Sequence, residues 1–489
     1  MSEMVDYMFY LRTISSVVIG VFVYVISTII IPPFEFPTNI PTIPFYVSFL
    51  GTYTNMDQEE IYNKYLRAKL EKYGAVKIYF ASRWNILVTK PEYLQEVFKY
   101  EDIYAKSGNQ EKIPYSVLAN YTGNNIISAH GKQWKLYRNV VQQSIQFPNI
   151  EPVHKNSQLL VKLIQDQITN KGDTFSVMDI LQKYALANVG ESVIGMNFKS
   201  LEEDDNELHN KIKYVKSQIF KPLYLNFPFL DMLPIPSRQK AMEEVRKFRD
   251  YFAQLVLGSR QSGETSNLAG NKLIEAYQNN SINFKSFTDN IIILMVAGHE
   301  NPLLLMLSLL YVIAKNRHVQ DQIRKEILEG VDNLPYTQSV IYETLRMYPP
   351  LGQIINRRTT RPVMLGNKIK IPQNVYVGYN NFGTGRDANI WNNADQFQPE
   401  RWGHTLEEIN SNYSIAKRNA QLPAFHGGKR ACLGEKFALL ETRAVVVEIL
   451  TNYDISLAEN WKDKLTPAGP VCPLMLKIKF ETHDKKSIH

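Results

Sequence analysis

Cysteine is scarce in this chain, whose 489 residues include only Cys432 and Cys472. Two cysteines cannot build a disulfide framework, so we expect a reducing compartment. A basic tract is also absent, because the formal charge of +7 is spread along the sequence. We therefore expect no nucleic-acid partner. The composition, 44% hydrophobic and 21% charged, predicts a large globular core rather than a disordered chain.

Charged residues are missing from residues 13–31. At about 1.5 Å of rise per residue, a helix of this length spans about 28 Å, close to the hydrocarbon thickness of a bilayer. A cleaved signal peptide and a buried core helix are the alternatives. Pro32 and Pro33 follow directly where a small-residue cleavage site would lie, so we predict a retained, single-pass membrane anchor at residues 1–31. Its orientation cannot be read from the weak flanking charge.

The next segment, residues 32–45, contains five prolines. Proline fixes the backbone angle φ and favours extended chain, so this segment predicts a stiff connector. We expect it to hold a catalytic domain, residues 46–489, at a set angle to the bilayer.

The most informative motif is a glycine-rich loop at residues 425–434, which reads Phe-His-Gly-Gly-Lys-Arg-Ala-Cys-Leu-Gly. It leads into an apolar helix predicted at 437–450. Positive charge on Lys429 and Arg430, together with the N-terminus of that helix, is expected to favour the thiolate form of Cys432. A thiolate is a haem-iron ligand that favours O–O cleavage. A structural cysteine buried in a tight turn is the alternative.

The loop resembles the haem loop of the cytochromes P450. Phe425, Gly428, Arg430, Cys432 and Gly434 occupy every fixed position of the pattern Phe-x-x-Gly-x-Arg-x-Cys-x-Gly. The resemblance implies a mainly α fold with a small β lobe, haem b as the cofactor and Cys432 as its axial iron ligand. It also places Phe425 and Arg430 among the cofactor-binding residues.

A second motif interrupts a long helix predicted at residues 286–316. The helix is apolar on almost every face, so we expect it to be buried in the middle of the domain. Gly298, His299, Glu300 and Asn301 break this pattern just before Pro302. Proline removes a backbone N–H, so a kink is predicted whose groove could hold O₂ and a water. A kink that serves packing alone is the alternative.

This stretch resembles the oxygen-binding segment of the same family, with one departure. Asn301 stands where a threonine is common, and an amide cannot pass a proton on as a hydroxyl does. We therefore take Gly298, His299, Glu300 and Asn301 as the candidate catalytic residues, with His299 or Glu300 supplying protons.

Three further residues are candidate haem-binding groups. Trp134 and Arg138 lie four residues apart on a predicted helix and share one face, where they could serve an anion. The family resemblance implies a haem propionate there; a surface cation over an aromatic ring is the alternative. Arg357 is implied as another propionate partner, although Arg358 beside it leaves the choice open. It precedes a predicted strand pair, residues 363–371 and 374–379.

Glu343 and Arg346 have the i, i+3 spacing of a pair on one helix. The resemblance implies a buried ion network that Arg401 completes. We expect these three residues to hold the haem loop in place and not to take part in the chemistry.

Several motifs together resemble the fungal branch of the family that makes dityrosine for spore walls. These are the segment at 297–301, the segment at 378–387 and the His426-Gly427-Gly428 stretch. The resemblance implies coupling of N-formyltyrosine phenols to bisformyl dityrosine. Hydroxylation of a fatty acid, sterol or xenobiotic is one alternative. An oxygen-independent haem–thiolate isomerase, dehydratase or sensor is another.

Partners and location are also implied. No flavin, nicotinamide or iron–sulfur domain accompanies the motifs, so we expect electrons from NADPH–cytochrome P450 reductase, docked at a positive face that includes Lys429. We expect the other partners to be a small aromatic or apolar substrate and membrane lipid. The resemblance implies the endoplasmic reticulum membrane, with the catalytic domain in the cytosol.

Overall fold

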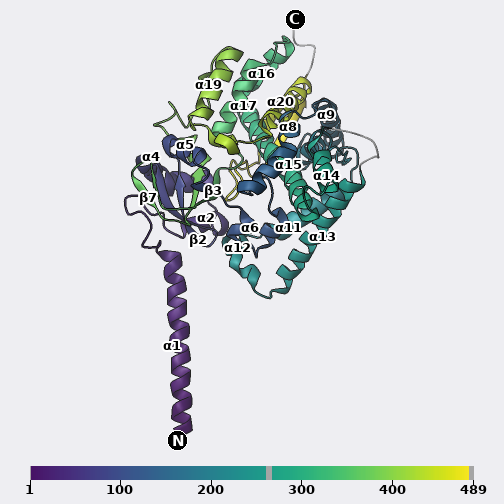
Figure 1. The fold of residues 1–489 in the computed structure, drawn as a ribbon. Coiled ribbons are helices and arrows are strands. Elements are labelled where there is room, and N and C mark those ends of the chain that lie inside the picture. The colour runs from purple at the N-terminus through teal and green to yellow at the C-terminus, as the bar shows by residue number, and fades with distance from the viewer. Residues whose placement is uncertain (1, 260–266, 484–489) are drawn as a thin grey trace.

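The computed structural model describes residues 2–259 and 267–483. Figure 1 shows one long helix, α1, standing away from a body in which a small β region lies beside many helices. The α-helices are α1 (Ser2–Ile30), α2 (Val47–Tyr53), α3 (Gln58–Ile61), α4 (Arg67–Tyr73), α5 (Pro91–Lys99), α6 (Asn109–Lys112), α7 (Val117–Thr122), α8 (Gly131–Gln146), α9 (Glu151–Lys171), α10 (Met178–Val189), α11 (Glu207–Ile219), α12 (Pro222–Asn226), α13 (Pro236–Gly258), α14 (Ala269–Gln278), α15 (Phe284–Lys315), α16 (Arg317–Leu328), α17 (Pro335–Met347), α18 (Asn381–Thr384), α19 (Leu406–Arg418) and α20 (Glu435–Asn452).

The strands and the shorter helical turns complete the body. The strands are β1 (Ala75–Phe80), β2 (Arg83–Val88), β3 (Tyr104–Lys106), β4 (Thr174–Ser176), β5 (Gln353–Thr359), β6 (Val363–Leu365), β7 (Ile369–Ile371), β8 (Tyr376–Asn380), β9 (Tyr453–Leu457) and β10 (Lys477–Thr482). The π-helical turns are η1 (Tyr62–Leu66) and η2 (Gly190–Ile194), and the 3₁₀ turns are η3 (Pro228–Met232), η4 (Pro399–Trp402), η5 (Pro423–Phe425) and η6 (Gly428–Arg430).

The strands form three small sheets. The largest has the order β1-β2-β8-β5-β3, the second has the order β4-β10-β9, and β6 pairs with β7 alone. The predicted pairing of residues 363–371 with 374–379 was wrong. Gly366 and Asn367 have φ angles of 56° and 55°, the geometry of a tight hairpin turn, so β6 folds back on β7. β8 pairs instead with β2 and β5.

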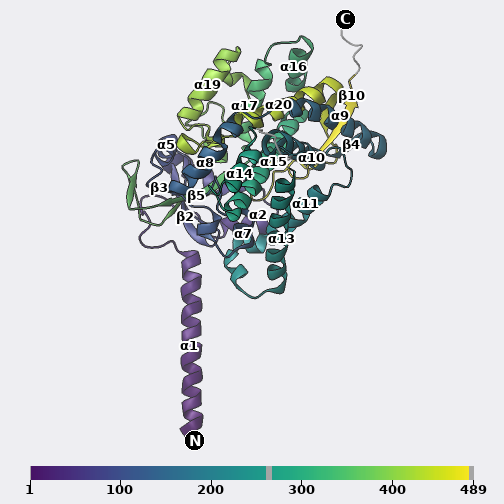
Figure 2. The ribbon, with the colours of Figure 1, turned by 45° about the vertical axis from the view of Figure 1, so that its right-hand side comes forward.

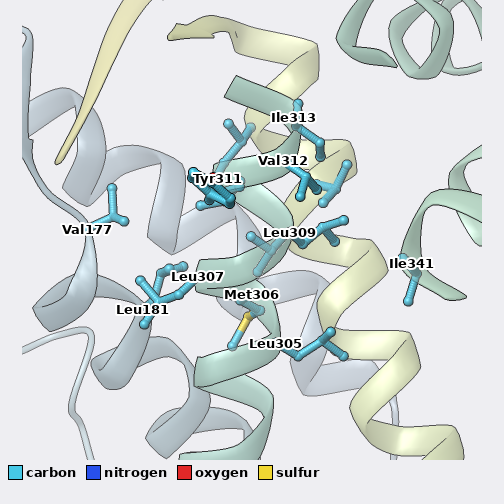
Figure 3. Close-up of a cluster of buried hydrophobic side chains, with 14 of the residues drawn as sticks. Val177, Leu181, Leu305, Met306, Leu307, Leu309, Tyr311, Val312, Ile313 and Ile341 are labelled. Atoms are coloured by element: carbon cyan, nitrogen blue, oxygen red, sulfur yellow. The ribbon is translucent and has the colours of Figure 1, made fainter. Parts of the chain in front are cut away.

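α15 is the central helix, as predicted. Asn283 caps its start by accepting a hydrogen bond from a backbone N–H of the first turn. Figure 3 shows its second half, whose large apolar side chains pack against those of α10 and α17. The helix continues through Pro302 without interruption, and the kink there stays a prediction.

The end of the N-terminal helix touches the body. Residues Arg12–Ile30 are long and apolar enough to cross a membrane, and this stretch is not buried in the body. Where the helix ends, the indole N–H of Trp84 donates to the Thr28 carbonyl oxygen (3.1 Å), and Ile29 packs on the core under the large sheet. This arrangement is consistent with the predicted anchor. α15 passes the same test of length and composition but is mostly buried.

The three residues of the predicted ion network lie together in the core. The carboxylate of Glu343 accepts hydrogen bonds from Arg346 (2.7 and 2.9 Å), from Arg401 (2.9 Å) and from the Trp402 indole (3.2 Å). Arg346 also donates to the Ala394 carbonyl oxygen (2.7 Å). Glu343 and Arg346 are both fully buried. The network therefore joins α17 to the long irregular segment that leads to η4.

We expect Arg346→Met to destabilise the body by about 3–5 kcal/mol, because it removes two hydrogen bonds from the buried Glu343 carboxylate and leaves Arg401 as its one guanidinium partner among the described contacts. Equilibrium unfolding in urea measures the loss. Lys247→Met is the matched control, since the Lys247–Glu243 pair is mostly exposed and such pairs contribute about 0–1 kcal/mol. A loss no larger than that of the control would contradict the role given to Arg346.

Candidate active site

A cavity of about 280 Å³ lies between α15 and the cysteine loop. Most of its wall is apolar. The predicted site residues on its wall are Cys432, Phe425, Arg430, Trp134, Arg138, Gly298 and Asn301. The structure thus brings together residues that are far apart in the sequence. His299, Glu300 and Arg357 do not line this cavity.

The cysteine loop is shaped by its contact with α5. The backbone N–H of Cys432 donates to the Phe425 carbonyl oxygen (3.0 Å), which closes the loop. A Cβ atom on Gly427 would lie 2.4 Å from the Phe98 ring, and one on Gly428 would lie 2.6 Å from the Phe98 carbonyl oxygen. Gly428 also has a φ of 61°. Only glycine fits at these two positions, so the loop can approach α5 closely.

The Cys432 sulfur is enclosed by protein and accessible from the cavity. Burial raises the pKa of this thiol to about 11, although the N–H groups of Gly434 and Glu435 act to lower it. The expectation that Arg430 supplies the charge was wrong. Its guanidinium group pairs with Glu101 (2.9 Å) and donates to the Ala129 carbonyl oxygen (2.7 Å). A bound metal cation is therefore the natural source of charge for a Cys432 thiolate.

Basic side chains lie at one edge of the cavity, with Lys106 on the wall and Arg357 next to Lys106 but off the wall. Arg357 is fully buried and donates to the Tyr104 carbonyl oxygen (3.2 Å), but its Nε and Nη2 atoms have no hydrogen-bond partner among the described residues. Lys106 on β3 pairs with Arg357 in register and lines the cavity. Burial lowers the pKa of Lys106, and the charges of Arg357 and Arg430 lower it further. Buried cations of this kind need an anion.

The haem propionates suit this edge, because each offers carboxylate oxygens to free N–H donors. Sequence reasoning left open whether Arg357 or Arg358 fills this role. Arg358 lies partly exposed near Glu111 (3.6 Å), so Arg357 is the better placed. Lys106 was missed, because only its long-range pairing with β5 brings it to the cavity.

Trp134 and Arg138 lie on α8 at the same edge. The guanidinium carbon of Arg430 lies 4.4 Å from the centroid of the Trp134 ring, and that of Arg138 lies 5.4 Å from it. Arg138 also donates to the Lys429 carbonyl oxygen (2.8 Å). These contacts tie α8 to the cysteine loop and leave both residues on the cavity wall.

α15 presents two faces at its polar break. Gly298 and Asn301 line the cavity, and a Cβ on Gly298 would lie 2.4 Å from Val189 of α10. Glycine at this position thus permits close packing of the two helices. His299 is fully buried, with Nδ1 2.6 Å from the Met295 carbonyl oxygen.

Glu300 points away from the cavity wall. Its Oε1 lies 2.6 Å from Lys216 of α11 and 2.9 Å from Nε2 of His299. Burial alone would raise the pKa of Glu300, but His299 and Lys216 outweigh it and hold the pKa at about 2. Glu300 is therefore a carboxylate near neutral pH, and it must leave Lys216 before it can carry a proton.

A cavity with one cysteine sulfur, a basic edge for two carboxylates and a polar break in the opposite helix defines a haem–thiolate oxidase. The chain belongs to the cytochrome P450 family, whose model, described as Cytochrome P450, matches residues 41–480. The predictions of family, fold class and enzyme class are confirmed. Its cofactor is haem, and enzymes of this family usually need a reductase as redox partner.

Comparison with known proteins identifies similar chains in fungi and mammals. Cytochrome P450-DIT2 of Saccharomyces cerevisiae is 48% identical over 94% of this chain and 96% of the yeast protein. Cytochrome P450 monooxygenase xanG of Aspergillus fumigatus is 37% identical over 89% of this chain and 86% of its own length. Cytochrome P450 3A16 of Mus musculus is 25% identical over 83% of this chain and 85% of its own length.

We expect Cys432→Ala to abolish the red-shifted Soret band that the reduced, carbon monoxide-bound enzyme shows, because that band requires a thiolate ligand. Absorbance spectra of the purified protein measure it. Cys472→Ala is the matched control and should keep the band, since Cys472 is buried in the core around α15. Loss of the band in both variants, or in neither, would contradict the assignment.

Proposed function

We propose that this enzyme couples the phenol rings of two N-formyltyrosine molecules to give bisformyl dityrosine for fungal spore-wall maturation. The observation that carries the proposal is Asn301, which lies on the cavity wall where the family commonly has a threonine. The similarity to Cytochrome P450-DIT2 agrees with the resemblance of the sequence motifs to the dityrosine-forming branch.

The reaction balances with one O₂. Each phenol gives up one electron and one proton, and the two rings then join by a C–C bond ortho to the oxygens. The reductase supplies two more electrons, solvent supplies two protons, and O₂ becomes two waters. Haem b, held by Cys432, would supply the redox chemistry, and the basic edge at Arg357 and Lys106 would hold its propionates.

The protein residues around the substrate have separate tasks. The apolar part of the wall, which includes Ile126, Ile293 and Leu305, would bind an aromatic ring and exclude water. The Asn301 amide would hold a water or the phenol oxygen by a hydrogen bond. Because Glu300 is paired with Lys216, few protons reach the site from α15. A phenol supplies its own proton, so this arrangement favours phenol coupling over C–H hydroxylation.

The main alternative is hydroxylation of a fatty acid, sterol or xenobiotic, which the mostly apolar wall also suits. An oxygen-independent reaction is the second alternative. Turnover with and without O₂ and NADPH distinguishes that alternative from both oxidases.

We expect the reconstituted enzyme to convert N-formyltyrosine to bisformyl dityrosine, detected by fluorescence and mass, in a reaction that needs O₂ and NADPH. Tyrosine and a fatty acid are the comparison substrates. Asn301→Thr should shift products toward hydroxylation, because a hydroxyl restores proton transfer. Formation of only hydroxylated fatty acid would overturn the substrate, and unchanged product ratios in Asn301→Thr would overturn the role of Asn301.

The electron donor that we propose is NADPH–cytochrome P450 reductase, docked beside the cysteine loop. Exposed lysines surround this loop, namely Lys135 on α8, Lys429 in the loop itself and Lys436 on α20. Lys436 lies over the ring of Phe147, just after α8 (5.4 Å), so the three lysines belong to one region. A positive face of this kind attracts an acidic partner.

The location that we propose is the endoplasmic reticulum membrane, with the body in the cytosol. Besides α1, an exposed apolar patch supports membrane contact; it consists of Phe220, Leu223, Phe229, Met232 and Leu233. Phe227, within this region, stacks on Phe49 of α2 (5.3 Å). Figures 1 and 2 show the α12 region on the same side of the body as α1. A bilayer could therefore meet both.

We expect Lys429→Glu to raise the KM for the reductase several-fold and to flatten the dependence of turnover on ionic strength, because it reverses a charge at the docking face. Steady-state turnover at several salt concentrations measures both. Lys247→Glu, on the exposed side of α13, should change neither quantity. A Lys429→Glu enzyme with an unchanged salt dependence would rule out this docking face.

A further inference from the structure

Four aromatic side chains pack in a row behind the cysteine loop, outside the cavity. Tyr342 of α17 and Tyr413 of α19 stack face to face, with centroids 3.7 Å apart and planes within 2°. Trp402 of η4 lies 5.8 Å from Tyr342, and Trp391 lies 5.6 Å from Trp402. The first three rings are buried, and Trp391 is half-buried. The row thus leads from the core toward the surface.

The inner end of the row is linked to the haem ligand. The Tyr413 hydroxyl donates to Oε1 of Glu435 (2.9 Å), which also pairs with Lys417. Glu435 begins α20, three residues after Cys432, and its backbone N–H acts to lower the pKa of the Cys432 thiol. Glu435 is therefore the residue that lies between the Tyr413 hydroxyl and the cysteine loop.

The row has the chemistry that one-electron oxidation requires. A phenol is oxidised most easily when a neighbouring base takes its proton, and Glu435 is placed to do so. Burial raises the pKa of Tyr413, so its hydroxyl keeps its proton until an electron leaves. The Trp402 indole N–H donates to the Glu343 carboxylate (3.2 Å), which stabilises positive charge on an oxidised indole.

We propose that these four rings form an escape path for oxidising equivalents when the haem–thiolate site turns over without substrate. One electron passes from Tyr413 to the oxidised site, and the phenol proton moves to Oε1 of Glu435. Trp402, whose ring centroid lies 6.2 Å from that of Tyr413, and then Trp391 supply the electron in turn, while Tyr342 stays a phenol stacked on Tyr413. A soluble thiol or ascorbate-type reductant restores Trp391 by giving one electron, and the proton returns from Glu435 to Tyr413.

The location of the oxidised state follows from the charges around the row. The guanidinium groups of Arg346 and Arg401 lie over the Trp391 ring at 5.6 and 6.0 Å, and they disfavour a positive charge there. The oxidised state therefore resides mainly on Tyr413 and crosses Trp391 only on its way to the outside reductant. This inference rests on the haem–thiolate oxidase activity and not on the identity of the substrate.

The test treats the full-length haem enzyme with hydrogen peroxide in the absence of substrate and freezes it for electron paramagnetic resonance. We expect a tyrosyl radical signal whose lines narrow when ring-deuterated tyrosine is incorporated. Tyr413→Phe keeps the stacked ring but removes the hydroxyl, so the signal should be lost and the enzyme should inactivate several-fold faster. Trp391→Phe should instead prolong the signal.

Tyr453→Phe is the matched control, because Tyr453 is also a buried, hydrogen-bonded tyrosine but lies outside the row. It should leave both the signal and the inactivation rate unchanged. An unchanged signal and an unchanged inactivation rate in Tyr413→Phe would overturn the proposal. A slower first electron transfer from the reductase in Tyr413→Phe would also overturn the proposal, because it would show that the row carries electrons from the reductase to the haem.

Discussion

The buried carboxylate of Glu343 is the interaction on which the rest of the body depends. A charge without solvent is stable only when its oxygens are fully bonded, and Glu343 accepts from Arg346, Arg401 and Trp402 and from the backbone N–H of Gln398. These donors come from α17 and from the segment before α19. Because α19 packs on α17, the network also sets the surroundings in which the cysteine loop and α20 meet.

The basic edge of the cavity is the opposite case, because its buried basic groups lack the partners that Glu343 has among the described residues. Arg357 has two free donor atoms, and Lys106 lies next to it without a carboxylate of its own among the described contacts. Isolated charges in a protein interior cost several kcal/mol. A dianionic ligand edge, such as the proposed pair of haem propionates, would match these groups. This part of the body would therefore gain stability on binding that cofactor.

The parts that the sequence predicted well are local. The cysteine loop is recognised because its glycines, arginine and cysteine are fixed within ten residues, and α15 because nearly all of its faces are apolar. Side-chain direction and long-range pairing were not predictable. Arg430 turns to Glu101, and Lys106 reaches the cavity through β5. The segment at 363–371, which was predicted as a single strand, forms its own hairpin because Gly366 and Asn367 adopt positive φ.

At the polar break of α15, the residue that could supply a proton and the residue that contacts the substrate lie on different faces of the helix. Asn301 faces the cavity but cannot relay a proton as a hydroxyl can, while Glu300 could do so but is held by Lys216 on the other face. A reaction in which Glu300 delivers the proton must first break the ion pair between Glu300 on α15 and Lys216 on α11. A substrate whose own O–H group is the source of the proton avoids this step, which is the physical reason that the geometry supports phenol coupling more than C–H hydroxylation.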